Sequence, residues 1–198
     1  MMRNRVKTFD VLRTLPILFK YADVAKFVSN PNVFLTRALR LGYVTRLMKG
    51  AYLNLFNGKL PEVEEVASFL RWPSYVSCEW ALNYHGLILQ SPLVCTVITL
   101  SGSVGGRNRI AYRSITIEYS RISESLFWGF KKVNGFNMAA PEKAIIDTIY
   151  LRKHIPFPDE LETYNLDMKE LKKIAQHYPG STQKLVERIL QGDVGTKT

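Results

Sequence analysis

Four polar side chains are spaced so that a single helix would bring them to one face, and their types suit binding to nucleic acid bases. They are Asn32, Thr36, Arg37 and Arg40, within a helix predicted over residues 32–41. Asn can form a bidentate pair of hydrogen bonds with adenine, and Arg can do so with guanine. This face is therefore a candidate for insertion into the major groove of duplex DNA.

Further basic residues come before and after this helix. Arg46 and Lys49 belong to a predicted β-hairpin that follows it, and Arg3, Arg5 and Lys7 lie near the start of the chain. Lys and Arg side chains that contact phosphates raise affinity for DNA without reading its sequence. We expect these five residues to hold the DNA backbone.

The positive charge is concentrated in the first third of the chain. The 198 residues carry a net charge of +10, and residues 1–60 hold eleven Lys or Arg against two Asp, a net charge of +9. A localised excess of this kind is typical of a surface that binds a polyanion. The alternative is a basic face that is merely solvated.

Serine or metal catalysis is not indicated by the spacing of the polar residues. Ser77 and His85 would be separated by about 12 Å of rise on one helix, too far for a hydrogen bond. We interpret Ser77 as the N-cap of that helix and His85, just before Gly86, as a structural residue at its C-terminus. His154 and His177 have no metal-ligand spacing.

Glu142, Lys143 and Asp147 are the residue types of a magnesium-dependent nuclease site. Their spacing argues against one, because Glu142 stands in a first helical turn, where it complements the dipole, and Asp147 lies about 140° further round. The glycine-rich residues 102–109 lack the Walker lysine position and the dinucleotide-binding spacing. We interpret them as a loop that touches DNA or a partner. We therefore predict no enzyme activity, no cofactor and no metal ion.

The elements that would position the basic face are those of a small helical domain. Apolar residues three positions apart predict a helix over residues 5–15, and a short helix fits residues 21–28. In the second of these helices Ala22, Ala25 and Phe27 would face inward.

The third helix is followed at once by a hairpin. Gly42 would end the helix, residues 43–47 and 51–55 have strand composition, and residues 48–50 supply a turn. Three helices, the last one basic, and then a hairpin are the order of a winged helix-turn-helix. The residues of the third helix expected to face the core are Val33, Leu35, Ala38, Leu39 and Leu41.

Past residue 60 the chain is charge-balanced, and a second domain is predicted to begin there. The fold class is thus α+β, with a winged helix-turn-helix over residues 1–60 and a mixed α/β domain over residues 61–198. The helices and strands expected in this domain cover residues 61–70, 77–85, 93–100, 110–119 and 140–151, followed by two helices in 167–190 that are broken at Pro179-Gly180.

The sequence contains no membrane-spanning run of about eighteen apolar residues, and its first residues lack the apolar stretch of a signal peptide. We therefore expect a cytoplasmic protein with no membrane partner. Cys78 and Cys95 lack CxxC spacing and are expected to be buried free thiols.

Three segments in this order resemble the AbiEi family of antitoxins and related predicted transcriptional regulators. They are residues 38–46 with 49–52, residues 75–77 with 80–87, and residues 139–147, and together they fall within residues 5–155. The resemblance implies a winged helix-turn-helix joined to an α/β domain, encoded beside a nucleotidyltransferase-like toxin.

The resemblance further implies that the protein binds operator DNA, represses its own operon and opposes the toxin without forming a stable complex with it. Two other functions stay open at this point. One is an enzyme that acts on nucleic acid and is targeted by the basic domain, and the other is an antitoxin that binds its toxin directly.

Overall fold

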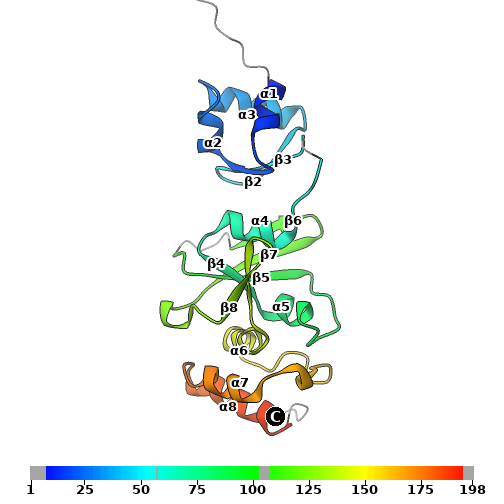
Figure 1. The fold of residues 1–198 in the computed structure, drawn as a ribbon, viewed down its shortest axis with the longest axis vertical. Helices are drawn as coiled ribbons and strands as arrows, with labels where there is room; N and C mark the ends of the chain where they lie inside the picture. The colour runs from blue at the N-terminus through cyan, green and yellow to red at the C-terminus, as the bar shows by residue number, and fades with distance from the viewer. Residues whose placement is uncertain (1–7, 57, 103–107, 194–198) are drawn as a thin grey trace, which may run out of the picture. The chain divides into compact units, whose positions relative to one another are not determined.

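Eight α-helices accompany a three-stranded antiparallel sheet and a six-stranded mixed sheet in the part of the chain that the computed structural model describes, residues 8–56, 58–102 and 108–193. The structure therefore has the predicted α+β composition. The chain divides into two units, residues 1–62 and 63–198, and each contains one of the sheets (Figure 1).

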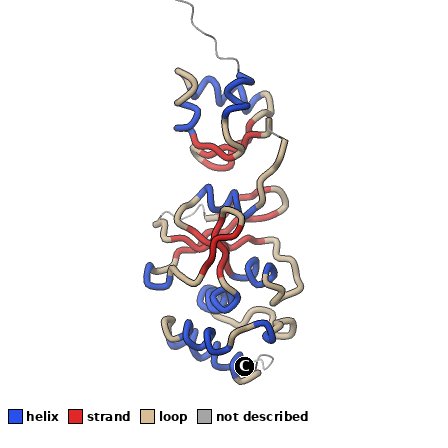
Figure 2. Tube along the Cα trace, in the orientation of Figure 1, coloured by secondary structure: helices blue, strands red, loops and turns tan. Residues whose placement is uncertain are grey.

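The first unit runs in the order helix, strand, helix, helix, strand, strand (Figure 2). The central strand of its sheet is β3, with β1 and β2 antiparallel on either side. The elements are α1 (Thr8–Thr14), β1 (Leu18–Lys20), α2 (Tyr21–Ala25), α3 (Pro31–Arg40), β2 (Val44–Met48) and β3 (Ala51–Asn54).

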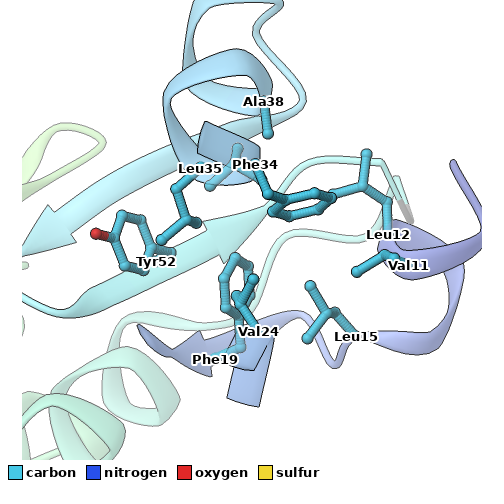
Figure 3. Close-up of a cluster of buried hydrophobic side chains, with 10 residues drawn as sticks. Val11, Leu12, Leu15, Phe19, Val24, Phe34, Leu35, Ala38 and Tyr52 are labelled. Carbon is cyan, nitrogen blue, oxygen red and sulfur yellow. The ribbon is translucent and has the colours of Figure 1, made fainter. Parts of the chain in front are cut away.

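One cluster of buried side chains holds the first unit together, with contributions from all three helices and all three strands (Figure 3). Each large apolar side chain that is fully buried contributes about 1.5–3 kcal/mol relative to an exposed one. The cluster therefore fixes the orientation of each helix around its own axis. Its members are Val11, Leu12, Leu15, Phe19, Val24, Phe34, Leu35, Ala38, Val44 and Tyr52.

The buried face of α2 is not the one expected from the sequence. Val24 is buried, whereas Ala22, Ala25 and Phe27 are exposed. The prediction was wrong because this helix has only five residues, too few for apolar spacing to define a face, and α2 contributes only Val24 to the cluster.

A buried amide links α1 to the sheet of the first unit. The Nδ2 of Asn54 donates to the carbonyls of Leu12 (2.8 Å) and Leu15 (3.2 Å), and its Oδ1 accepts from the amide of Phe56 (3.1 Å). Carbonyls at the end of a helix lack partners within the helix. The side chain of Asn54 on β3 donates hydrogen bonds to these carbonyls, so it holds the end of the helix against the strand.

The second unit contains a sheet of order β6-β7-β5-β4-β9-β8, in which β5 pairs parallel with β7 and β4 pairs parallel with β9. Its other neighbouring strands are antiparallel. The strands are β4 (Ser74–Ser77), β5 (Val94–Thr99), β6 (Arg109–Tyr112), β7 (Ile115–Arg121), β8 (Phe130–Val133) and β9 (Phe136–Ala139).

Helices cover both faces of this sheet. Figure 1 shows α4 on one face and α6 on the other, with α5 packed beside α6 and the pair α7 and α8 packed on its outer side. This burial on two sides explains why every residue from Glu142 to Ile149 in α6 is buried. The helices are α4 (Val63–Leu70), α5 (Cys78–Tyr84), α6 (Pro141–Arg152), α7 (Met168–Ala175) and α8 (Gly180–Leu190), with short 3-10 turns at Glu124–Leu126 and Thr163–Asn165.

The interior of the second unit contains a paired charge. Lys143 and Asp147, one turn apart on α6, form an ion pair with both side chains fully buried. The ammonium also donates to the hydroxyls of Tyr75 (2.9 Å) and Tyr178 (2.5 Å), while the carboxylate accepts from Ser77 (2.8 Å) and from both tyrosines. The cluster joins β4, α6 and the turn between α7 and α8.

Burial governs the protonation of this cluster. It lowers the pKa of Lys143 below its ordinary value, although the nearby carboxylate of Asp147 favours the charged form. It also raises the pKa of Tyr75 and Tyr178 far above the usual range, and the charge of Asp147 adds to this rise. Both phenols therefore remain protonated and able to donate to the carboxylate.

The structure differs from the sequence prediction at two places in this unit. Ser77 stands at the start of α5 as expected, but its hydroxyl donates to Asp147 rather than capping the helix. The strand expected over residues 110–119 is a hairpin, because Arg113, with a φ of 54°, makes a turn between β6 and β7. Cys78 and Cys95 are buried free cysteines, as predicted.

Among the described helices, none has both the length and the apolarity that crossing a bilayer requires.

We predict that Asp147→Asn lowers the free energy of unfolding by about 3–5 kcal/mol, because it leaves the buried ammonium of Lys143 without a counter-charge. Glu170→Gln is the matched control. Glu170 pairs with Lys173 at the surface (3.2 Å), and loss of such a pair changes stability by less than about 1 kcal/mol. Denaturant unfolding measures both, and equal effects would contradict the role given to the buried pair.

Candidate nucleic-acid interface

The helix α3 has defined signals at both ends. Asn30 precedes it, and its side-chain oxygen accepts from the amide of Val33 (3.3 Å), with Pro31 in the first helical position. At the other end the amide of Tyr43 donates to the carbonyl of Ala38 (3.0 Å), and Gly42 has a φ of 72°. This geometry is a Schellman motif, which ends a helix at a residue that tolerates the left-handed conformation.

The core contacts of α3 decide which of its residues face outward. Phe34, Leu35 and Ala38 are buried in the cluster of the first unit. The four residues expected to read DNA bases lie away from this buried face, and all are exposed. They are Asn32, Thr36, Arg37 and Arg40.

Three apolar residues of α3 and its end were expected to face inward, and the structure places them outside. Val33 is 63% exposed, Leu41 48% and Leu39 36%. Phe34, which the sequence analysis did not assign to the core, is buried in their place. The buried stripe thus consists of two adjacent residues and one a turn later, a narrower stripe than the prediction assumed.

The hairpin of β2 and β3 carries the two basic residues assigned to it, and both are exposed. The strands lose regular register between Arg46 and Met48, and the Nε of Arg46 donates to the carbonyl of Met48 (3.4 Å). Lys49 lies in the turn, which is anchored because the amide of Tyr21 donates to the carbonyl of Gly50 (2.9 Å). The hairpin is therefore attached to the start of α2 as well as to its own sheet.

The charge on this unit is largely uncompensated. Its described residues include eight Lys or Arg and three acidic residues. Of the acids, the carboxylate of Asp23 forms an ion pair with Lys26 (2.8 Å) and accepts a hydrogen bond from the backbone amide of Lys20 (2.9 Å). Bonding to Lys26 and Lys20 lowers the pKa of Asp23.

Lys26 has a carboxylate partner among the described residues, whereas Arg37 and Arg40 do not. Within the described part of the chain no carboxylate pairs with either guanidinium. Both lie near the C-terminus of α3, where a cation also complements the helix dipole. Both side chains are exposed, so their hydrogen-bond donors are accessible to a ligand.

Three predicted phosphate contacts, Arg3, Arg5 and Lys7, lie outside the described residues. The same unit contains exposed cations that were not among the predicted DNA contacts, including Arg13 on α1 and Lys20 on β1. Their position in the basic first third of the chain was the sequence signal that could have identified them as further candidate contacts.

The residues considered for catalysis are held in structural contacts. Lys143 and Asp147 belong to the buried cluster described above, and a carboxylate oxygen of Glu142 accepts from the amide of Asp167 (2.9 Å). The Nε2 of His85 donates to the carbonyl of Ala139 (2.8 Å). These contacts give each residue a role in folding.

The remaining candidates are dispersed. His154 bonds to the carbonyl of its neighbour Ile155 (3.0 Å), and the ring of His177 packs edge-on against Trp128 at 5.1 Å. In the described residues no three His, Cys, Asp or Glu side chains gather in a way that could hold a metal ion. Residues 103–107 of the glycine-rich loop lie outside the described part of the chain.

Arg109, at the end of that loop, belongs to a second ion-pair network. It pairs with Glu118, which also accepts from Arg152 (3.1 Å), and Arg152 bonds to Glu79 (3.0 Å). Burial alone would raise the pKa of Glu118, but hydrogen bonds from the two arginines outweigh it and hold that pKa below its usual value. Arg109 is thus engaged within its own unit.

Comparison with known proteins gives no further assignment, since no protein-family model and no curated protein matches the chain.

We predict that Asn30→Ala weakens α3 by about 1 kcal/mol, because it removes the side-chain acceptor for the amide of Val33. Hydrogen exchange at the amides of α3 would report the loss, and Asn30→Asp should retain most of the protection. Asn32→Ala is the control, since this exposed side chain makes no hydrogen bond among the described residues. Equal loss of protection in Asn30→Ala and Asn32→Ala would contradict the capping role.

Proposed function

We propose that this chain is a DNA-binding transcriptional regulator whose first unit is a winged helix-turn-helix. The observation that carries the proposal is the outer face of α3, where Arg37 and Arg40 are exposed beside Asn32 and Thr36. Guanidinium and amide groups that remain exposed can form bidentate hydrogen bonds with guanine and adenine in the major groove.

The architecture of the first unit supports the proposal. In a winged helix-turn-helix, the second helix of the motif is the recognition helix and lies in the major groove. In this chain that helix would be α3. A short strand between the first two helices, pairing with a hairpin that follows the third, agrees with this order. The hairpin of β2 and β3 then corresponds to the wing, and α3 packs against β2.

Arg46 and Lys49 on that hairpin would contact the phosphate backbone, together with Arg3, Arg5 and Lys7. Contacts of this kind set affinity and its dependence on salt, while the residues of α3 supply sequence preference. The low number of acidic residues in this unit favours its approach to a polyanion.

The regulatory purpose rests on the resemblance of the three sequence segments to AbiEi-type antitoxins. On that basis we propose that the protein binds operator DNA of its own operon, represses it, and counteracts a nucleotidyltransferase-like toxin without a stable complex. The proposal includes a cytoplasmic location. Catalysis by Glu142, Lys143 and Asp147 is not part of it, since the last two side chains are fully buried in the core.

We predict that Arg37→Ala with Arg40→Ala weakens binding of the full chain to duplex DNA by at least about tenfold at physiological salt. The slope of log affinity against log salt should change little, because these two arginines are assigned to bases and the slope falls by about 0.9 only for each phosphate contact that is lost. Fluorescence anisotropy with labelled duplexes measures both quantities.

Lys169→Ala with Lys172→Ala is the matched control, because it removes the same charge from exposed positions on α7 in the second unit. This control should bind DNA nearly as well as the unaltered protein. Unchanged affinity in the double arginine variant, or equal losses in the two variants, would overturn the assignment of α3.

The regulatory part of the proposal has its own test. A reporter driven by the DNA upstream of the gene should be repressed by the intact protein and released by the double arginine variant. Co-purification with the product of the adjoining gene is expected to fail. A stable one-to-one complex would instead favour an antitoxin that binds its toxin, and an unrepressed reporter would remove the autoregulatory role.

A further inference from the structure

An apolar side chain lies in the middle of the polar outer face of α3. Val33 is 63% exposed, in the first turn of the helix. Thr36, Arg37 and Arg40 follow it by three, four and seven positions, and residues at these separations share one face of a helix. All three are exposed as well. Val33 is therefore surrounded by the groups that the proposed function directs at DNA.

Folding of the first unit does not account for a valine here. The core of the unit takes Phe34, Leu35 and Ala38 from α3, and Val33 is not among the residues packed against it. A β-branched residue also lowers the stability of an exposed helical position relative to alanine. Its two methyl groups are therefore accessible to a ligand of the first unit.

We propose that Val33 reads the C5-methyl group of a thymine in the major groove. This inference rests on the proposed DNA-binding function and specifies what part of the ligand one side chain recognises. The thymine methyl is the apolar feature that the major groove displays, and small apolar side chains contact it. Residues in the first turn of a recognition helix contact base edges, and Val33 occupies the third helical position after Asn30.

The position of Val33 favours this ligand over an apolar protein partner. The cations Arg37 and Arg40 lie on the same face and have no carboxylate partner among the described residues. Burying such groups against an apolar protein surface would cost free energy without compensation. A DNA groove offers acceptors to the guanidinium groups and a methyl group to the valine within one ligand.

The experiment compares thymine with uracil, which lacks only the C5-methyl group. Duplexes that the full chain selects from a pool with a randomised core are sequenced, and the enriched site is remade with deoxyuridine at each thymidine in turn. For the unaltered protein, one replacement should weaken binding by about fourfold, the effect expected for loss of one buried methyl contact. In Val33→Ser that difference should disappear.

Thr36→Ser is the matched control, because it removes a neighbouring methyl group from the same face and should retain the discrimination. Thermal unfolding of both variants should match that of the unaltered protein, since both side chains are exposed. Discrimination that persists in Val33→Ser, or that is lost only in Thr36→Ser, would overturn the proposal.

Different outcomes of this experiment contradict DNA binding and the role of Val33. If the unaltered protein shows no salt-dependent binding to any duplex, the proposed function itself is wrong. If it binds duplexes but enriches no site, or enriches a site at which no thymidine is sensitive to replacement, DNA binding stands and the role of Val33 is overturned.

Discussion

The burial of one narrow stripe of α3 is the constraint on which the candidate interface depends. Phe34, Leu35 and Ala38 enter the same apolar cluster as Leu12 and Phe19, and this fixes the rotation of the helix about its axis. The opposite face must then meet solvent, whatever residues it carries. The exposed side chains of Asn32, Thr36, Arg37 and Arg40 lie on that face, so the core packing of the helix also orients them. The cap at Asn30 and the Schellman motif at Gly42 fix the length of the helix in the same way.

The second unit is organised around a different interaction, the buried pair of Lys143 and Asp147. Taking two charges out of water is costly, and the cost is offset only where every donor and acceptor finds a partner. Here the ammonium of Lys143 donates to Asp147, Tyr75 and Tyr178, and the two carboxylate oxygens of Asp147 also accept from both tyrosines and from Ser77. These partners come from the sheet and from the helical pair beyond α6, so the cluster can form only when these layers are assembled. The cluster thus specifies how the sheet, α6 and the pair of helices beyond α6 pack together. Its residues have a structural role in the fold.

Some features were predictable from the sequence because their signals are local. The third helix was expected over residues 32–41 and is Pro31–Arg40, and the break at Pro179-Gly180 separates α7 from α8 as expected. The hairpin of β8 and β9 also had a local signal, since Asn134-Gly135 favours a two-residue turn with positive φ, and it was overlooked. The strand β1 has only three residues, and its pairing with β3 depends on partners 31 to 35 positions away. A sequence pattern of that length carries no such information.

The candidate site likewise has features that the local sequence predicts and one that depends on the packing of the whole unit. The charge excess and the helical spacing of Asn32, Thr36, Arg37 and Arg40 could be read directly, since both are properties of adjacent sequence. The direction of Val33 could not, because a helix of this composition has two plausible apolar stripes. Only the shape of the core selects between them, and it takes Phe34 in preference to Val33. A single choice of rotation thus decides whether a valine supports the fold or faces a ligand, and here it turns an expected core residue into part of the outer face.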